Sequence, residues 1–304
     1  MHAVPKHLPP TTGTPTFRGR SAQEDPWWVR WSLIALSVLV LLILVILPIS
    51  NVFYHALSHG LGTYFKNLSD PETVHAIKLT MFVAPVAVMA NVVFGVAAAW
   101  AITRFRFPGR TLLTTIIDLP FAISPVVVGL MFVMLFGNQG VFGSWLQANG
   151  FKILFAWPGI VLATTFVTLP FVARELIPVM EAIGSDEEIA AISLGANGWQ
   201  MFWRVSLPNM KWGLLYGIIL CNARAMGEFG AVYVVSGRII NKTETLPIRV
   251  NTLFEGGSAE TYSSSFAAAS LLTMLALITL FIKIALERKT QLDLREAAEI
   301  QQIE

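Results

Sequence analysis

Three ionisable residues lie inside long apolar runs of the sequence: Asp118 in one run, and Arg224 and Glu228 in another. Arg224 and Glu228 are four residues apart, so a continuous helix would place them on one face. A charge in an apolar medium costs several kcal/mol and marks either a structural ion pair or a polar pathway. Both roles stay open here. In the second role, Ser124 and Ser236 would add neutral hydrogen-bond donors along the pathway.

A second stretch, SDEEIAAISLGANGWQMFWRVSLP at 185–208, has the features of a short capped helix between two apolar runs. Ser185 and Glu188 have the spacing of a capping box, in which each side chain binds the other residue's backbone amide. The first turn is acidic, as the positive end of a helix dipole favours. Gly195 interrupts the helix, the following Asn-Gly pair predicts its C-terminal stop, and a second short helix follows until a Leu-Pro pair.

Small residues line the first half of this stretch, so another backbone could approach it closely. We therefore predict a docking helix for a cytoplasmic partner, with the contact made by Glu187, Glu188, Ile189, Ala190, Ala191, Leu194 and Gly195. The alternative is an interfacial helix that lies on lipid through Trp199, Phe202 and Trp203. Those aromatic residues do not account for the acidic, alanine-lined first half, which favours docking.

Membrane-spanning helices must position these residues. Of the 304 residues, 55% are hydrophobic and only 13% are charged, whereas a soluble domain has about 25% charged residues. The apolar blocks have the length of helices that cross the hydrocarbon core. We predict an all-α integral membrane protein with six spans, at 29–54, 76–103, 112–136, 153–173, 212–235 and 266–286. Residues 1–25 are predicted to form a disordered tail, 26–290 the transmembrane domain and 291–304 a C-terminal tail.

Lysine and arginine are unevenly distributed between the two sets of loops. One side would receive Arg18, Arg20, Arg30, Arg104, Arg106, Arg110, Arg174, Arg204, Lys211, Lys283, Arg288, Lys289 and Arg295; the other would receive Lys66, Lys152, Arg238, Lys242 and Arg249. Because cytoplasmic loops carry the excess, both termini and the 174–211 loop are predicted to be cytoplasmic. Two prolines, Pro120 and Pro125, predict a kinked or interrupted third span.

The 185–208 stretch resembles the cytoplasmic signature of bacterial ABC-importer permeases, E-A-A-x3-G-x9-I-x-L-P. The matching positions are Ala190, Ala191, Gly195, Val205, Leu207 and Pro208, and the family's glutamate falls at Ile189, one residue after Glu188. LGANGWQMFWRVSLPN, LLYGIILCNARAMGEFGAVYVVSG, ETLPIRV and SSSFAAASLLTMLALITLFIK are similar to sulfate/thiosulfate permeases. The FGAV run at 229–232 resembles the W-type rather than the T-type subunit, and the similarity covers roughly residues 30–286.

This resemblance implies the transmembrane subunit of an ATP-driven sulfate/thiosulfate importer in the bacterial inner membrane. It implies a second, related permease subunit, two ATP-binding subunits docked at 185–208, and a periplasmic sulfate-binding protein docked on 55–75, 137–152 and 237–264. The sequence contains no G-x-x-x-x-G-K-[ST] P-loop, the motif that cradles nucleotide phosphates. We therefore predict that this chain is not an enzyme and binds no cofactor, and that ATP and Mg belong to the partner ATPase.

Other functions remain open. Molybdate, tungstate or phosphate could replace sulfate as the cargo. An ion-gradient-driven secondary transporter would show matching repeats in its two halves, and none is evident. A membrane scaffold without transport activity is a further alternative. The sequence has no basic-aromatic patch of the kind that binds nucleic acid.

Overall fold

A computed structural model describes the backbone of residues 27–303 and the side chains of residues 27–288. Within this part of the chain every regular element is a helix. The chain divides into two units, Met1–Ser50 and Asn51–Glu304. The predicted tail at 1–25 lies outside the described residues. Most of the predicted 291–304 tail continues the last helix, which ends at Ile303.

The first described helix is apolar and continues from the first unit into the second. It begins as α1 (Trp27–Leu41), passes through the π-helical segment η1 (Leu42–Ile46) and continues into α2 (Leu47–Leu57). This helix accounts for the predicted span at 29–54. Its start carries exposed Trp27, Trp28 and Trp31, the residue type that favours a membrane interface.

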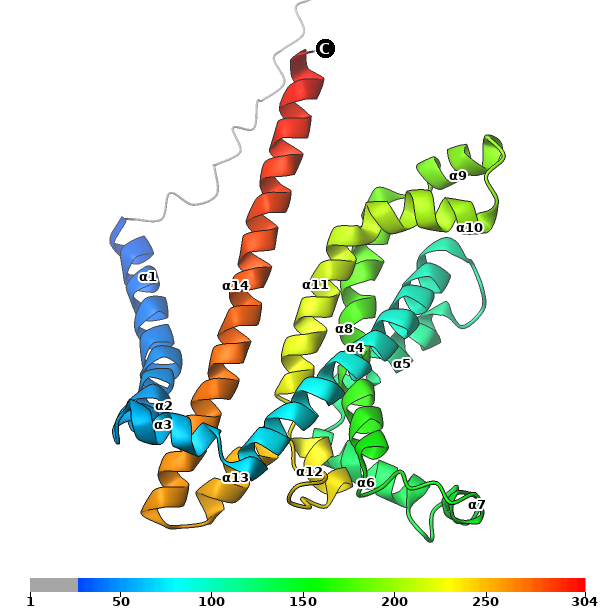
Figure 1. Ribbon diagram of the computed structural model, residues 1–304. Helices are drawn as coiled ribbons and strands as arrows, with labels where there is room; N and C mark the ends of the chain where they lie inside the picture. Colours follow the sequence, from blue (N-terminus) through cyan, green and yellow to red (C-terminus); the bar gives the residue numbers. More distant parts are fainter. Residues whose placement is uncertain (1–26, 304) are drawn as a thin grey trace, which may run out of the picture. The chain divides into compact units, whose positions relative to one another are not determined.

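The second unit is a bundle built around three packed helices, α4, α8 and α11 (Figure 1). Its elements are α3 (Leu61–Leu68), α4 (Pro71–Arg104), α5 (Arg110–Ala122), α6 (Pro125–Phe136), α7 (Gly143–Ala148), α8 (Trp157–Ile183), α9 (Asp186–Ser193), α10 (Gly198–Met201), η2 (Phe202–Ser206), α11 (Leu207–Met226), α12 (Gly230–Ser236), α13 (Leu246–Glu255) and α14 (Ala259–Ile303). In this bundle α9 and α10 lie at one end, and α7, α12 and α13 lie at the other (Figure 1).

Small residues allow the three central helices to pack closely. A Cβ on Gly95 of α4 would lie 2.7 Å from the Cβ of Val172 in α8, and one on Gly217 of α11 would lie 3.1 Å from the Val172 Cα. Such glycines permit close backbone approach between membrane helices. Asn91 donates to the hydroxyl of Thr168 at 2.7 Å in the same buried layer.

Among the described residues, four helices are long and apolar enough to cross a membrane, and two bent helix pairs raise the number to six if each pair is one span. The first pair is α5 and α6, and the chain bends by 108° between them. Between them Ile123 and Ser124 have extended backbones, with ψ of 135° and 133°. The residue before a proline is disfavoured in helical geometry, so Pro125 accounts for the break at Ser124. The predicted interruption of the third span is therefore present.

The second bent pair is formed by the helix that ends with α11 and by α12, and the chain bends by 53° between them. The predicted span at 212–235 is not one unbroken helix, because α11 ends at Met226 and α12 begins at Gly230. The two helices that follow the breaks, α6 and α12, pack on each other. A Cβ on Gly129 of α6 would lie 2.7 Å from the Val234 Cβ, and one on Gly230 would lie 2.9 Å from the Pro125 Cβ.

The fourth helix, α8, is longer than its predicted range of 153–173 and ends at Ile183. Arg174 was assigned to a loop, and this part of the prediction is wrong because the residue lies inside α8. The sequence after position 173 contains Arg174, Glu175, Pro178 and Glu181, which resemble the composition of a loop. The helix nevertheless continues through them, and two of these charges, Arg174 and Glu181, form ion pairs with α5.

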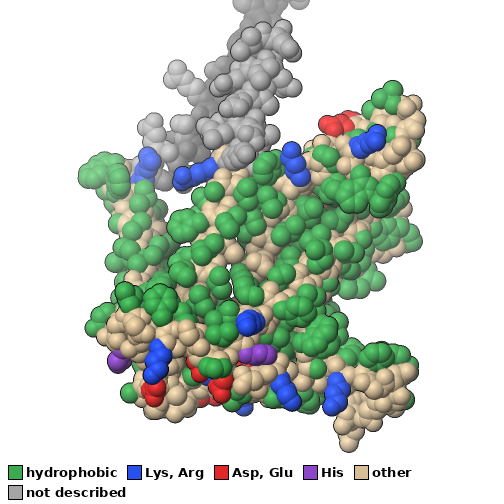
Figure 2. All heavy atoms as spheres, in the orientation of Figure 1, with side chains coloured by type: hydrophobic (Ala, Val, Ile, Leu, Met, Phe, Trp, Pro, Cys, Tyr) green, Lys and Arg blue, Asp and Glu red, His purple; other side chains and the backbone are tan. Residues whose placement is uncertain are grey.

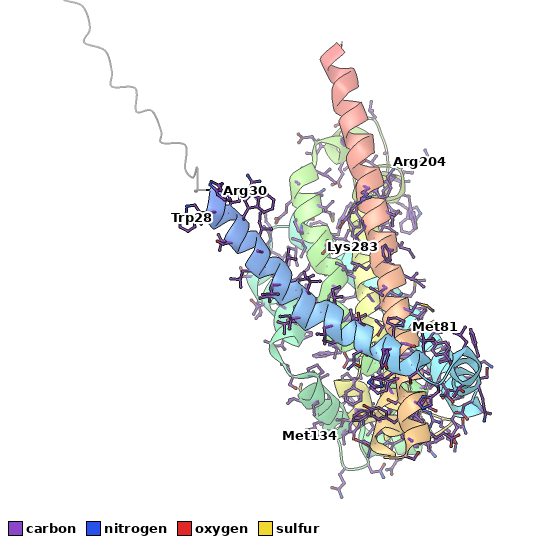
Figure 3. The ribbon with its side chains drawn as sticks, turned by 90° about the vertical axis from the view of Figure 1, so that its left-hand side faces the viewer. Trp28, Arg30, Met81, Met134, Arg204 and Lys283 are labelled. Carbon is purple, nitrogen blue, oxygen red and sulfur yellow. The ribbon has the colours of Figure 1, made fainter. Side chains whose placement is uncertain are left out.

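Charged side chains gather toward the two ends of the visible face of the bundle, and hydrophobic side chains cover its middle (Figure 2). Arg204 lies at the end that carries α9 and α10, and Met134 lies at the opposite end (Figure 3). At that opposite end the buried Arg249 of α13 pairs with Asp70 at 3.1 Å and with Glu72 at 2.7 Å. These ion pairs attach α13 to the start of α4.

Candidate functional site: the α9 surface and the charged residues of the spans

Helix α9 is attached to the bundle by one buried carboxylate. Glu188 accepts from Arg104 Nε at 2.7 Å through Oε2, and from Arg104 Nη2 at 3.1 Å through Oε1. The hydroxyl of Ser206 donates to the same Oε1 at 2.9 Å. Charge-assisted bidentate bonds of this kind fix both position and orientation. Glu188 therefore points into the protein, whereas the sequence placed it on the docking surface.

The capping box predicted for Ser185 and Glu188 is wrong. Ser185 is the residue before α9, yet its side chain makes no capping hydrogen bond. The Glu188 carboxylate is already bound to Arg104 and Ser206, so it cannot also reach back to the Ser185 amide. The acidic first turn remains favourable at the helix N-terminus.

Arg104 connects three elements at this end of the bundle. It ends α4, binds Glu188 of α9, and donates to the carbonyls of Met180 at 3.1 Å and Gly184 at 2.7 Å. The last carbonyls of a helix lack partners within it, and a cation at this end also complements the helix dipole. One guanidinium therefore caps α8 and holds α9 in place.

The turn after α9 is made by Gly195, whose φ is 91°. Because an L side chain rarely adopts this backbone conformation, glycine ends the helix here. Asn197-Gly198 was predicted to be the stop, and this prediction is wrong: Asn197 instead caps the start of α10. Its side chain accepts from the Gln200 amide at 2.8 Å, and Gln200 binds the Asn197 amide in return, which forms a capping box.

The face of α9 and its turn directed away from the bundle is apolar and exposed. Ile189, Ile192 and Leu194 are exposed, and Leu194 reaches 89%. Glu187 is also exposed and accepts from the side chain of Asn209. Ala190 is exposed, Ala191 is half-buried, and the space around Gly195 is open within the described chain. Six of the seven residues predicted for docking therefore retain surface area, and Glu188 does not.

Among the predicted pathway residues, Asp118 pairs with an unexpected partner. Arg174 of α8 donates to Asp118 from Nε at 2.8 Å and from Nη2 at 3.2 Å. The side chains are 58% and 35% exposed, respectively. The guanidinium also lies over the Phe121 ring, 5.0 Å from its centroid. The pair is therefore open on one side, and the exposed neighbouring side chains of α5, Ile116, Leu119 and Phe121, are apolar.

Arg224 and Glu228 form the ion pair that their spacing predicts, with Nη1 and Oε2 2.7 Å apart. Glu228 lies in the break between α11 and α12, and its Oε1 accepts from the Ala231 amide at 3.1 Å. The Glu228 side chain is 1% exposed and the Arg224 side chain is 36% exposed. Glu228 therefore caps α12, and only the arginine of the pair keeps an open face.

The two serines differ in their surroundings. Ser124 lies in the α5–α6 break and is exposed, and its side chain makes no capping bond to α6. Ser236 is fully buried, and its hydroxyl accepts from the Arg238 amide at 3.2 Å. The structure therefore gives Ser124, but not Ser236, an accessible hydroxyl.

Comparison with known proteins identifies the family. Residues 91–292 match the model of the family described as "Binding-protein-dependent transport system inner membrane component". The chain belongs to this family. The matched range includes α9, the α5–α6 break and the α11–α12 break.

Relatives of this inner membrane component are sulfate permeases. The chain is 51% identical over 260 residues to "Sulfate transport system permease protein CysW" of Escherichia coli (strain K12), which covers 86% of this chain and 88% of that protein. It is 38% identical over 247 residues to "Sulfate transport system permease protein CysT" of the same strain, covering 80% and 89%.

A solved structure has the same fold. The bacterial ABC transporter involved in the import of the acidic polysaccharide alginate matches with a TM-score of 0.71 and 18% identity, covering 86% of this chain and 96% of that chain. At this identity the likeness concerns the fold alone. It supports the assignment of this family member to the all-helical ABC permease fold.

Three residues of the site were missed from the sequence. Arg104 and Arg174 were counted only as loop charges, and Ser206 was not considered. A signal for Arg174 was available, because Asp118 in a membrane span needs a cation and Arg174 follows the neighbouring apolar run. No local pattern in this inner membrane component predicts that Glu188 reaches Arg104, 84 residues away.

Proposed function

We propose that this chain is the transmembrane subunit of an ATP-driven importer that forms the translocation path for sulfate or thiosulfate. The observation that carries the proposal is the 51% identity to the Escherichia coli sulfate permease over most of both chains. The family description, with its dependence on a binding protein, supports import rather than export.

In this proposal α9 is the coupling helix that docks to the ATP-hydrolysing subunit. The exposed side chains of Ile189, Ile192 and Leu194 support docking, because apolar residues on a protruding turn are expected to be covered by a partner. Ile189 stands where the family signature has glutamate, so the contact there is apolar. The neighbouring Glu187 then supplies a negative charge on the same surface.

We place α9 and both chain termini in the cytoplasm, with six spans in which α5–α6 and α11–α12 are each one broken span. The lysine and arginine distribution supports this orientation. Loops 55–75, 137–152 and 237–264 then face the periplasm, where the sulfate-binding protein would dock.

The complex would contain a second, related permease subunit, two ATP-binding subunits and the binding protein. Similarity to both CysW and CysT of one strain supports a pair of related but different permeases. In this arrangement ATP and Mg are bound by the ATPase subunits, and the present chain carries no catalytic residue. Movement of the ATPase pair would reach the spans through α9 and the Arg104–Glu188 contact.

The decisive experiment reconstitutes the four kinds of subunit in vesicles with labelled sulfate. We expect uptake that requires ATP and is inhibited by excess unlabelled sulfate or thiosulfate. Molybdate, tungstate and phosphate serve as competitors, and stronger inhibition by one of these would reassign the cargo. Uptake driven by an ion gradient without ATP would instead support a secondary transporter and contradict the proposal.

A further inference from the structure

Two ion pairs connect α5 with α8 at two successive levels along the helices. Arg110 Nη2 and Glu181 Oε1 are 2.9 Å apart near the α9 end of the bundle. Asp118 and Arg174 form the second pair. Asp118 lies eight residues after Arg110, which is roughly 12 Å along a helix. The second pair, which we call the inner pair, is therefore about two turns deeper in the bundle than the outer pair.

The inner pair differs from the other deep charges in its exposure. The Glu188 and Glu228 side chains are almost completely buried against their partners. The inner pair is instead open on one side, although exposed apolar residues such as Ile116, Leu119 and Phe121 surround it. Holding an open charged pair in lipid costs several kcal/mol, so such residues face water or a protein surface.

The geometry of the inner pair fits a competing oxyanion. Arg174 uses Nε and Nη2 for Asp118, and within the described residues Nη1 makes no hydrogen bond. A guanidinium presents its donors in a planar fork that suits two oxygens of one anion. A carboxylate and a sulfate therefore compete for the same donors, and the carboxylate is already in place.

We propose that Arg174 is a specificity residue of the translocation path, which binds the oxyanion in transit, and that Asp118 is its internal counter-ion. An unpaired cation in a narrow path would hold a dianion too long, because transport requires release as well as entry. Asp118 replaces the departing anion at the same donors. This inference rests on the proposed function and assigns one contact within it.

We assign oxyanion binding to Arg174 rather than to Arg224 because their carboxylate partners differ in burial and in their other contacts. Glu228 is buried and also caps α12, so separating it from Arg224 would leave a buried carboxylate unpaired. Asp118 is half-buried, with 35% of its side chain exposed, and makes no capping bond of this kind, so its carboxylate keeps access to solvent when Arg174 turns to another anion. The inner pair can therefore open and close without damage to the bundle.

The first test removes both charges of the inner pair. In the whole complex, Arg174→Met with Asp118→Leu is expected to assemble and to reduce ATP-dependent sulfate uptake at least tenfold. The matched control, Arg110→Met with Glu181→Leu, removes the outer pair and is expected to keep uptake within twofold. Uptake within twofold of wild type for the inner-pair variant would overturn the inference. If the wild-type complex itself fails to import sulfate, the proposed function fails instead.

A second measurement does not depend on uptake. Arg174→Cys in a Cys221→Ser background would be treated with a charged, membrane-impermeant thiol reagent, applied to both sides of vesicles that hold the assembled complex. Reaction is expected, because a path residue faces water. Absence of reaction in a complex that purifies intact would place the residue against lipid or the partner permease and would overturn the inference. Failure of the complex to assemble with both the inner-pair variant and Arg174→Cys would also overturn it.

Discussion

Arg104 and Glu188 join the end of α4 to the first turn of α9 by two hydrogen bonds, of 2.7 and 3.1 Å. The side chains are almost completely buried, and the same guanidinium caps the end of α8. This contact fixes the surface that we propose as the ATPase docking site to two of the central helices. A force on α9 is therefore transmitted to α4 and α8 together.

Arg104→Met is expected to destabilise the protein because it leaves the Glu188 carboxylate buried without its cation. Breaking a buried pair in this way costs about 3–5 kcal/mol. Arg110→Met breaks an exposed pair between α5 and α8 and should cost less than about 1 kcal/mol. Thermal unfolding of the purified complex in detergent should separate the two variants, and equal midpoints would contradict the assigned role of Arg104.

Gly195→Trp is expected to leave the chain in the membrane and to abolish substrate-stimulated ATP hydrolysis by the complex. Within the described residues a Cβ at this position meets no atom within 4 Å, so the indole would start into open space, where a docked partner would meet it. Gly195→Ala is the control, because it imposes the same unfavourable φ of 91° with little added volume. Normal hydrolysis by a Gly195→Trp complex that purifies intact would show that α9 is not the docking helix.

The Arg224–Glu228 pair can be tested while the cap of α12 is preserved. Arg224→Met alone should impair assembly, since it leaves Glu228 buried and charged. Adding Glu228→Gln removes the charge but keeps a side-chain oxygen for the Ala231 amide, so assembly should recover. We expect sulfate uptake to stay below one tenth of wild type in the double variant. Recovery of uptake along with assembly would make the pair purely structural.

The orientation can be measured with single cysteines in a Cys221→Ser background. Ser193 in α9 and Ser258 before α14 are both exposed, so each would accept a thiol reagent. In intact cells an impermeant reagent should label Ser258→Cys and should label Ser193→Cys only after permeabilisation. The reverse pattern would invert the topology.

The sequence predicted the elements better than their contacts. Each predicted apolar block coincides with a helix or a bent helix pair of the described chain, because the hydrocarbon core imposes a length that composition alone reveals. Pro125 predicted the break in the third span, because its effect on Ser124 is local. The end of α8 was missed, since the charged residues after position 173 end the apolar run but not the helix, which continues to Ile183.

At the candidate site, too, local features were predicted from the sequence and long-range contacts were not. Six of the seven predicted docking residues keep exposed area, because helix periodicity and the position of Gly195 determine which face is free. Glu188 was assigned to the wrong face, since its partners Arg104 and Ser206 are brought to it by the tertiary fold. A capping box was the simplest local explanation, but the distant cation competes more strongly for the carboxylate.

Pro125 serves both broken spans. It forces the bend between α5 and α6, and it also forms the surface on which Gly230, the first residue of α12, rests. The residue that starts the helix after one break is therefore also the residue against which the start of α12 packs. A change of angle between α5 and α6 would therefore displace the start of α12, so the two bent helix pairs are mechanically coupled through this contact.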